Sequence, residues 1–475
     1  MSTTSESSSP TASAADDVSH DLIIVGTGSG NSIPGPEFDD WDVAIVERGV
    51  FGGTCLNVGC IPSKMFVYAA DIATHVEHAE KYGLDVSLNG VDWPSIVNRV
   101  FGERIDPIAA GGEKYRVEEC DNITVYQESA RFVGPGRLQV GDKVITAPNI
   151  VLGAGGRPFT PAFPGVDDLT VHTSDSVMRL PELPARMAVI GAGYIGAEMG
   201  HVFGSLGTDV TLLVRSGAML RNEDDEVSAR ATEMYGERFD LRLNTTIVSG
   251  RQDGDEIVLT LNGPDGESEL RVDVLLSAAG RVPNSDQLNV EAAGIETHPN
   301  GKVKIDGFMA TNVEGVWAFG DLANNYDLKH VANAEVKVLA HNLLHPEDRR
   351  EIDYGHVPHA VFGWPQIAGV GLTERAARDE GRNILIAKKD YGAVAYGWAM
   401  EDDTSFGKLV VDADTRLLLG AHIIGPQSST MIQQLIQGMR FGQTVDEMAH
   451  DQMYIHPALS ELVENLLLEV PDSPR

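Results

Sequence analysis

Positive charge is scarce in this sequence. Its 36 Lys and Arg residues, of which only 11 are Lys, stand against 70 Asp and Glu residues, so the formal net charge is −34. A chain this acidic repels phosphate backbones and anionic lipid surfaces, so we expect no nucleic acid and no membrane among its partners. No apolar run reaches the ~18 residues of a membrane-spanning helix, and no basic region followed by an apolar stretch opens the chain. We expect a soluble, cytoplasmic protein.

Cysteine is scarce as well, with three residues in a chain of 475. Three thiols are far too few for a disulfide scaffold, yet Cys55 and Cys60 stand only five positions apart. In a reducing compartment such a close pair is more often redox-active or metal-binding than structural. Cys120 stands alone, and we interpret it as an ordinary, partly buried thiol.

The remaining composition is that of a globular protein, with 42% hydrophobic, 6% aromatic and 22% charged residues. At roughly 150 residues per domain, two to four domains are expected. Residues 1–19, rich in Ser, Thr and Ala, show no apolar period and are predicted to form a disordered tail.

A first nucleotide-binding unit is predicted near the start of the chain. Residues 21–26 have the pattern of a buried strand that runs into a glycine turn, and residues 42–47 that of a second strand. Glycines in the turn let the backbone approach a pyrophosphate, and Glu47 stands where an acid would bind a ribose. The turn positions are Gly26, Gly28 and Gly30.

The helix after this first turn is predicted to be unusual. Asn31 replaces the third glycine of the motif, and Pro34 and Pro36 follow it, so the helix must be short or begin late. We expect the ligand site to survive with altered packing beneath it.

A second nucleotide-binding unit is predicted from residue 187 to residue 214. Its turn carries the complete glycine motif, at Gly191, Gly193 and Gly196. At the end of its second strand, where an acid would bind the ribose of NAD, the sequence has Arg215, and Arg221 follows six residues later. Because arginine pairs with a 2′-phosphate, these residues favour NADPH over NADH, the alternative being two solvated surface arginines.

The cysteine pair stands in the segment Gly52–Lys64. A turn through Gly59 allows the Cα spacing that a disulfide needs, and a thiolate just inside a helix, with Lys64 four residues on, would have a lowered pKa. A zinc site would need two further ligands, which the lone third cysteine does not provide. The segment therefore predicts a redox-active pair.

Near the C-terminus, His456 precedes Pro457, and Glu461 follows at the distance of about one helical turn if the proline opens a helix. A carboxylate beside an imidazole fixes its tautomer and stabilises the imidazolium, which suits a general acid that protonates a leaving thiolate. Taken alone, the motif is more often structural than catalytic.

Together these motifs, with Gly320-Asp321, resemble the flavoprotein disulfide reductases from about residue 20 to the end of the chain. Five longer stretches narrow the resemblance to the actinobacterial members that reduce mycothione; they are residues 28–33, 64–70, 328–335, 394–402 and 455–459. The resemblance implies FAD in the first unit, NADPH in the second and a homodimer built by the C-terminal domain. The sequence departs from the usual family pattern at 152–158 and at Ser63, where it keeps small residues.

The resemblance also implies roles for individual residues. Cys60 would be the sulfur nearest the flavin and Cys55 the sulfur that exchanges with substrate, while His456, backed by Glu461, would come from the other subunit. Lys64 and Glu198 would form an ion pair near the flavin, and Tyr194 would cover the nicotinamide pocket. Asp321 would contact the ribityl chain of the flavin, and Arg215 with Arg221 would bind the 2′-phosphate. The remaining predicted cofactor-binding positions are Gly53, Thr54, Gly155, Ile195, Gly280 and Gly320.

The predicted fold class is α/β, with two Rossmann-like dinucleotide-binding domains and a C-terminal α+β dimerisation domain. In that last part we expect both strands and helices; the strands are at 367–372, 383–387, 408–411 and 417–424, and the helices at 373–380, 429–440 and 458–468. We predict four segments: the tail 1–19, an FAD-binding domain 20–158 with 282–356, an NADPH-binding domain 159–281, and a dimerisation domain 357–475.

The predicted function is the NADPH-dependent reduction of a low-molecular-weight disulfide, first of all mycothione to two mycothiol. One alternative is bis-γ-glutamylcystine, which the acidic surface of a salt-adapted protein would suit, although lineage drift explains that surface too. A second is dihydrolipoamide dehydrogenase, which would prefer NAD and carry an acid at position 215. A non-enzymatic FAD-binding scaffold would need neither the cysteine pair nor the histidine with its carboxylate.

Overall fold

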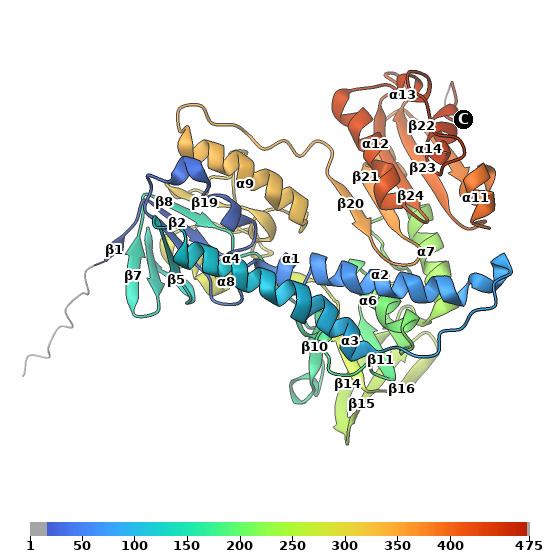
Figure 1. The fold of residues 1–475 in the computed structure, drawn as a ribbon, viewed down its shortest axis with the longest axis horizontal. Coiled ribbons are helices and arrows are strands. Elements are labelled where there is room, and N and C mark those ends of the chain that lie inside the picture. Colours follow the sequence, from blue (N-terminus) through green and yellow to red (C-terminus); the bar gives the residue numbers. More distant parts are fainter. Residues whose placement is uncertain (1–16, 473–475) are drawn as a thin grey trace, which may run out of the picture. The chain divides into compact units, whose positions relative to one another are not determined.

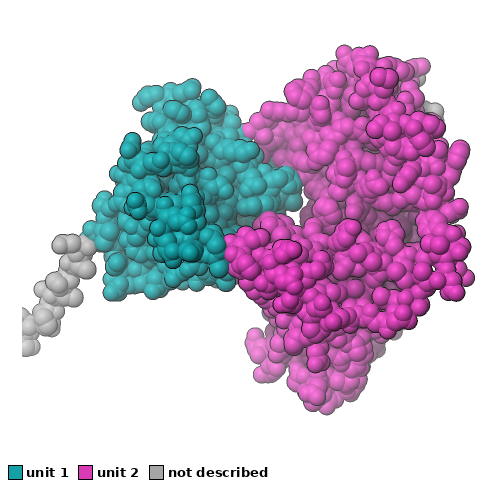
Figure 2. Space-filling view, viewed as in Figure 1, with its two compact units in different colours: residues 1–53, 109–156, 283–352 teal, residues 54–108, 157–282, 353–475 magenta. Residues whose placement is uncertain are grey.

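Two units, each assembled from three stretches of chain, make up the computed structural model, which describes residues 17–472 (Figure 2). Unit 1 comprises the stretch ending at Gly53, Ala109–Gly156 and Pro283–Ile352, and unit 2 comprises Thr54–Ile108, Arg157–Val282 and the stretch from Asp353 onward. Residues 1–16 of the predicted tail lie outside the described residues. Val18–Ser19, at the end of that predicted tail, instead form strand β1, which pairs with β7 (Lys143–Thr146).

The centre of unit 1 is a five-stranded parallel sheet in the order β19-β8-β2-β3-β4. Strand β2 (Leu22–Val25) is buried along its whole length, because both faces of the sheet are covered. Ile23 and Val25 pack towards one core, which the small sheet β1-β7-β6-β5 completes, whereas Leu22 and Ile24 pack towards helix α9. The ribbons of this small sheet and of α9 are seen in Figure 1. This is the first predicted Rossmann-like unit.

The other elements of unit 1 complete these layers. They are η1 (Ser29–Ser32), η2 (Pro36–Phe38), β3 (Val43–Val46), α4 (Asp106–Glu118, which begins in unit 2), β4 (Ile123–Tyr126), β5 (Ala130–Gly134), β6 (Arg137–Val140), β8 (Asn149–Leu152), α8 (Ser285–Leu288), η6 (Val290–Ala293), β19 (Val316–Ala318), η7 (Gly320–Leu322) and α9 (Lys329–Leu344). Only the two 3₁₀ turns η1 and η2 stand between β2 and β3, which confirms the prediction of a short helix after the first glycine turn.

Unit 2 contains a second parallel sheet, in the order β10-β17-β11-β12-β13, and a three-stranded antiparallel sheet, β14-β15-β16. Helix α2 (Cys60–Glu77) packs along α6 (Tyr194–Ser205), with Phe66 and Ala70 in the same core as Val202 and Phe203. Because of this packing the cysteine-bearing segment clusters with unit 2, although we expected it in the FAD-binding domain. The domain boundaries themselves stay a prediction.

The C-terminal part of unit 2 is a five-stranded antiparallel sheet, β20-β21-β24-β23-β22, with helices α12 and α14 packed in one core with it (Figure 1). Its strands are β20 (Pro358–Val361), β21 (Ile367–Gly371), β22 (Ile384–Asp390), β23 (Phe406–Asp412) and β24 (Leu418–Ile424). Its helices are α10 (Glu374–Asp379), η8 (Tyr391–Ala393), α11 (Ala395–Ala399), α12 (Ser428–Phe441), α13 (Val445–His450) and α14 (Glu461–Leu468). Each predicted strand and helix has a counterpart whose bounds agree to within about three residues, whereas β20, α11 and α13 were not predicted.

The earlier elements of unit 2, and those at its junctions with unit 1, are α1 (Gly53–Asn57), η3 (Ala79–Tyr82), α3 (Trp93–Val97), the π-helical segment η4 (Asn98–Ile105), β9 (Gly156–Pro158), η5 (Val166–Asp168), β10 (Val171–Thr173), α5 (Ser174–Val177), β11 (Arg186–Ile190), β12 (Asp209–Leu213), α7 (Asp225–Arg238), β13 (Asp240–Arg242), β14 (Thr246–Asp253), β15 (Glu256–Gly263), β16 (Gly266–Val272), β17 (Val274–Ser277) and β18 (Arg281–Pro283). Within residues 17–472 we find no helix of the length and apolar character needed to cross a bilayer.

Candidate functional site

Helix α2 starts at Cys60, with Gly59 as its N-cap, three residues earlier than the helical stretch expected from Ser63; Cys60 stands just inside a helix start, as expected. A hydrogen bond from Cys55, on α1, lowers the pKa of Cys60 to about 7; partial desolvation of the thiol opposes this shift, and the charge of Lys64 supports it. The helix N-terminus favours the thiolate in addition. Neither cysteine forms a disulfide in this structure. The arrangement holds Cys60, a thiol of lowered pKa, beside the Cys55 thiol.

Lys64 lies one turn along α2 from Cys60 and pairs with Glu198 of α6. Its Nζ is 2.6 Å from both carboxylate oxygens, and Glu198 is 7% exposed. The backbone N–H of Phe362 donates to the same carboxylate at 3.0 Å, and the ammonium lies over the Phe362 ring, 4.7 Å from its centroid. The structure thus brings the two predicted members of the ion pair together, and the ammonium fixes a positive charge near the thiolate.

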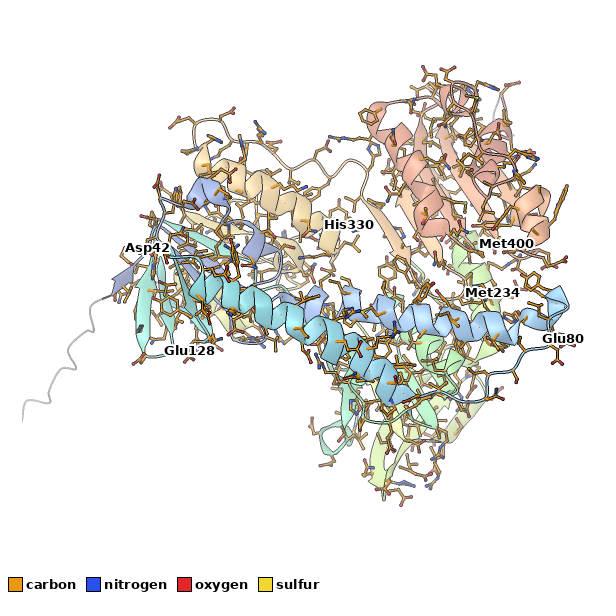
Figure 3. All side chains as sticks on the ribbon, viewed as in Figure 1. Asp42, Glu80, Glu128, Met234, His330 and Met400 are labelled. Atoms are coloured by element: carbon orange, nitrogen blue, oxygen red, sulfur yellow. The ribbon has the colours of Figure 1, made fainter. Side chains whose placement is uncertain are left out.

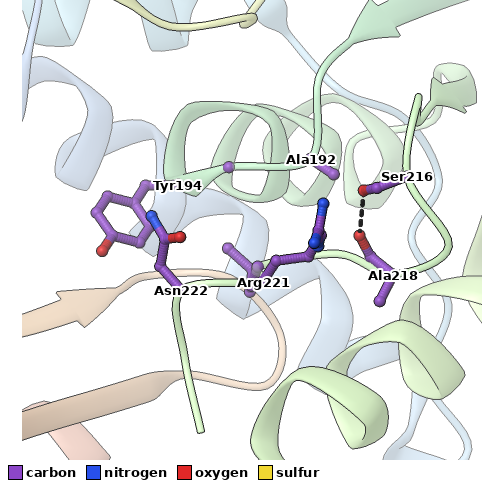
Figure 4. A pocket seen from close by; sticks show the side chains of 8 residues that line it. Ala192, Tyr194, Ser216, Ala218, Arg221 and Asn222 are labelled. Atoms are coloured by element: carbon purple, nitrogen blue, oxygen red, sulfur yellow. Dashed lines mark hydrogen bonds between the residues drawn. The ribbon is translucent and has the colours of Figure 1, made fainter. Parts of the chain in front are cut away.

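A cavity of about 230 Å³ opens at the second glycine turn, where the backbone of Gly191 adopts a left-handed φ of +112° (Figure 4). Its lining residues are Ala192, Gly193, Tyr194, Ser216, Ala218, Leu220, Arg221 and Asn222. Figure 4 shows the Tyr194 ring and the Arg221 guanidinium towards different sides of this cavity. Tyr194 and Arg221, predicted for the nicotinamide and the 2′-phosphate, therefore line one pocket, whereas Arg215 is not part of its lining.

Arg215 follows β12 directly, and both it and Arg221 are exposed. Among the residues that the structure describes, neither arginine forms an ion pair, although the chain carries 70 acidic residues. Two unpaired guanidinium groups at the end of the second Rossmann strand are equipped to bind a phosphate dianion.

The first glycine turn is held by Glu47, at the C-terminal end of β3. One of its carboxylate oxygens accepts hydrogen bonds from the backbone N–H of Thr27 at 2.9 Å and from its hydroxyl at 2.6 Å. Gly26 has a φ of +98°, and a Cβ there would lie 2.5 Å from the carbonyl oxygen of Gly153. A Cβ on Gly53 would lie 2.6 Å from Gly28 Cα. These bare backbone surfaces form a cradle that fits the pyrophosphate of a dinucleotide such as FAD.

The imidazole of His456 contacts Glu461, with 2.7 Å between Nδ1 and Oε1. The sequence places Pro457 in the first helical turn, and this prediction is wrong: the His456–Pro457 peptide bond is cis, and α14 begins only at Glu461. The turn before the helix, closed by the Ala458 N–H on the Ile455 carbonyl, still brings the two side chains together. His456 is 73% exposed and bonds no other side chain among residues 17–472.

Residues 20–335 match the family model of the pyridine nucleotide-disulphide oxidoreductases, and residues 357–467 match the model of that family's dimerisation domain. The chain belongs to the pyridine nucleotide-disulphide oxidoreductases.

Individual relatives agree with this assignment. Mycothione reductase of Mycobacterium tuberculosis is 46% identical over 462 residues, which cover 94% of this chain and 99% of the relative. Dihydrolipoyl dehydrogenase of Halobacterium salinarum is 33% identical over 93% of this chain and 94% of its own length. The solved structure of the HOCl-induced flavoprotein disulfide reductase RclA from Escherichia coli superposes with a TM-score of 0.84 at 26% identity, covering 95% of this chain and all of that one.

As a pyridine nucleotide-disulphide oxidoreductase, the chain is an enzyme, a flavoprotein disulfide reductase whose cofactors are FAD and NAD(P)H. Two Rossmann-like domains and a dimerisation domain, the fold class predicted from the sequence, are confirmed. The roles of single residues stay predictions that rest on the geometry above.

The other predicted cofactor positions are described within their own units. In unit 1, Gly320 opens η7 after β19, with Asp321 next to it, and Gly155 has a φ of +60°. In unit 2, Gly280 has a φ of +127°. Two more positions lie on helices; they are Thr54 on α1 and Ile195 on α6.

Three polar residues around the first glycine turn escaped the sequence-based prediction. Arg116 of α4 donates to the side chain of Asn31 at 2.9 Å and to its carbonyl at 2.7 Å, which explains how an asparagine is accommodated where the family motif has glycine. Lys329 of α9 donates to Ser29, beside the turn, at 2.8 Å. Glu335, fully buried on α9, accepts from the backbone N–H of Gly320 at 2.8 Å. The stretch 328–335 was one signal for the last two, whereas nothing in the sequence marked Arg116.

Proposed function

We propose that this enzyme reduces a low-molecular-weight disulfide with NADPH, and that its substrate is mycothione, the symmetric disulfide of mycothiol. The observation that carries this proposal is the 46% identity to the mycothione reductase of Mycobacterium tuberculosis, which extends over 94% of the chain. The dihydrolipoyl dehydrogenase of Halobacterium salinarum, a relative with a different activity, is 33% identical to this chain.

The residues that would hold FAD are those of the first glycine turn with Glu47. Those that would hold NADPH are the lining residues of the cavity at the second turn, Arg221 included, together with Arg215 just after β12. Arg215 and Arg221 favour NADPH, because each offers an unpaired guanidinium to a 2′-phosphate. When bound, FAD accepts a hydride from the nicotinamide and supplies two electrons to the cysteine disulfide.

In the chemistry that follows, Cys55 acts as the nucleophile. His456 first accepts the thiol proton of Cys55, and the resulting thiolate attacks one sulfur of the substrate disulfide. A mixed disulfide forms and the first thiol leaves as a thiolate, to which His456 returns that proton. Cys60, whose pKa is lowered to about 7, then attacks the Cys55 sulfur and releases the second thiol. The cysteine disulfide is regenerated, and one disulfide with two electrons and two protons has become two thiols. Glu461 keeps the Nδ1 proton of His456 in place, so that Nε2 carries the reacting proton.

We also propose that the working molecule is a homodimer in the cytoplasm, with His456 acting on the cysteine pair of the other subunit. The matched dimerisation domain supports this, and so does the exposure of the segment around His456, where Met453 is 98% and Ile455 75% exposed. Large exposed apolar side chains of this kind are usual at subunit interfaces.

Steady-state turnover of four disulfides with NADPH and with NADH tests the proposal; they are mycothione, bis-γ-glutamylcystine, glutathione disulfide and lipoamide. We expect kcat/KM to be highest for mycothione with NADPH. Preference for bis-γ-glutamylcystine would support the first alternative, which has only the acidic surface in its favour. Preference for lipoamide with NAD(H) would identify a dihydrolipoamide dehydrogenase, against which Arg215 argues.

A further inference from the structure

An acidic run, Glu223 to Glu226, joins the end of the pocket loop to helix α7. Its members face a row of basic side chains on neighbouring strands of the C-terminal sheet, since β20 pairs with β21, β21 with β24, and β24 with β23. The basic residues of this row are His359, His422 and Lys408. Gly369 stands between the two histidines as the cross-strand partner of each, and His422 is the partner of Lys408. The loop that lines the pocket is therefore attached to that sheet.

Lys408 makes this attachment rigid. It is 2% exposed, and its Nζ lies 3.0 Å from Asp224, 2.9 Å from Glu226 and 2.7 Å from Glu374. Carboxylates that share a buried ammonium cannot move apart without exposing an uncompensated charge. Glu223, next to Asp224, is consequently held in one place.

Glu223 and His359 form a pair of their own. The distance from Glu223 Oε2 to His359 Nε2 is 2.8 Å, and the glutamate is 1% exposed. Its other oxygen has no partner within the described part of the chain. Gly369 leaves room for the imidazole, because a Cβ at that position would lie 2.7 Å from His359 Cε1.

The other neighbour of the His359 imidazole is Tyr194, the first residue of α6. The two rings stack, with centroids 6.0 Å apart and an angle of 17° between their planes. With its ring in this position Tyr194 lines the open cavity of about 230 Å³. Burial of the phenol, together with the charge of Glu223, raises the pKa of Tyr194 to about 12, so its ring stays neutral.

We propose that His359, oriented by Glu223, is a positioning residue that holds the Tyr194 ring against the wall of the pocket and so keeps the nicotinamide end of the NADPH site open. Without the stacked imidazole, the tyrosine side chain gains rotamers that fill the cavity, and each nicotinamide that binds has to displace it. The inference rests on the proposed use of NADPH. Neither His359 nor Glu223 lines the cavity itself.

Isothermal titration of the FAD-loaded, oxidised protein with NADP⁺ and with 2′,5′-ADP tests this inference. The second ligand has the 2′-phosphate but no nicotinamide, so it reports on the arginine end of the site alone. An aromatic stack of this kind corresponds to a change of about 2- to 10-fold in an equilibrium constant. We expect His359→Ala to weaken NADP⁺ binding by that factor and to leave 2′,5′-ADP binding unchanged.

Three further variants complete the experiment. His359→Phe keeps a flat ring and should restore most of the lost affinity, and Glu223→Ala, which frees the imidazole, should weaken NADP⁺ binding in the same direction. His172→Ala is the matched control, because within residues 17–472 the His172 side chain bonds only Ser176, and it lies outside the cavity lining. It should bind both ligands as the wild type does.

Two results would overturn the inference: unchanged NADP⁺ affinity in His359→Ala, or an equal loss for both ligands, which would mark general damage to the domain. Failure of the proposed function looks different. In that case the wild-type protein itself would bind neither NADP⁺ nor 2′,5′-ADP.

Discussion

Several influences act on the pKa of the Cys60 thiol. The hydrogen bond from Cys55 lowers its pKa, partial desolvation raises it, and the Lys64 ammonium lowers it again, with a net value of about 7. The spacing of these three residues was readable from the sequence, because two of them lie within one turn of a single helix. The size of the effect depends on the fold, which pairs that ammonium with Glu198 and so fixes it in place.

The first prediction concerns the reactivity of Cys60 with pH. In the reduced protein its thiolate should form above a midpoint near pH 7, so alkylation of the Cys60 peptide by iodoacetamide should be fast above that pH and slow below it. Lys64→Met should move the midpoint upward, since the thiolate loses a nearby positive charge. Mass spectrometry of the peptide across pH 5–10 measures this. Lys114→Met, which removes an exposed helix-surface lysine paired with Glu118, is the control, and a midpoint that ignores Lys64 would contradict the assignment.

The second prediction concerns the coenzyme. Arg221→Ala should raise KM for NADPH by about 10- to 100-fold and leave KM for NADH unchanged, because a charge-assisted contact to the 2′-phosphate is lost. Arg251→Ala removes an exposed arginine that pairs with Glu269 and should change neither value. Equal KM changes for both coenzymes would refute the phosphate contact.

At the scale of elements, helices and strands followed the sequence where one local signal dominated. The apolar runs of β2 and β3 had to be buried strands, and Pro34 and Pro36 excluded a regular helix between them. The start of α14 was missed, because a turn closed by the Ala458 N–H on the Ile455 carbonyl precedes the helix and leaves Pro457 outside it. The packing of α2 on α6 is a tertiary contact between segments more than 100 residues apart, and no local pattern encodes it.

The third prediction concerns the first glycine turn. Gly26→Ala introduces a methyl group 2.5 Å from the Gly153 carbonyl oxygen at a φ of +98°, so the turn must open and the cradle is lost. A residue other than glycine at such a φ is strained by roughly 1–3 kcal/mol. We therefore expect the purified variant to contain less than half of the wild-type flavin, measured as the ratio of absorbance at 450 nm and 280 nm. Gly136→Ala has a φ of +66° with nothing within 4 Å and should keep its flavin. Full flavin content in the Gly26 variant would disprove the cradle.

At the scale of the whole molecule, the structure shows where the acidic and the basic side chains lie. Acidic side chains such as Asp42, Glu80 and Glu128 are exposed (Figure 3), whereas Lys408 places a buried positive charge among carboxylates, and Arg215 and Arg221 place positive charge where we propose that the coenzyme binds. A protein of net charge −34 needs such local exceptions to bind an anionic dinucleotide.

The fourth prediction tests the dimer. Cys55→Ser and His456→Gln homodimers should each be almost inactive, but co-expression of the two chains should restore about a quarter of the wild-type sites, since half of the dimers are mixed and carry one intact site. Light scattering should give twice the chain mass. If His456 serves its own chain, the mixed preparation stays inactive, and co-expression of Cys55→Ser with Cys60→Ser is the matched negative control.

The sequence by itself was enough to predict the two nucleotide-binding turns, the cysteine pair at a helix start and the classes of cofactor, because glycine turns, cysteine spacing and terminal acids or arginines act within a few residues of each other. Only the tertiary structure decided that Arg116 stabilises Asn31, that Glu335 holds Gly320, and that His359 with Glu223 stands behind Tyr194. These contacts join residues from separate elements, and their energies depend on burial and on distances that the order of residues does not contain.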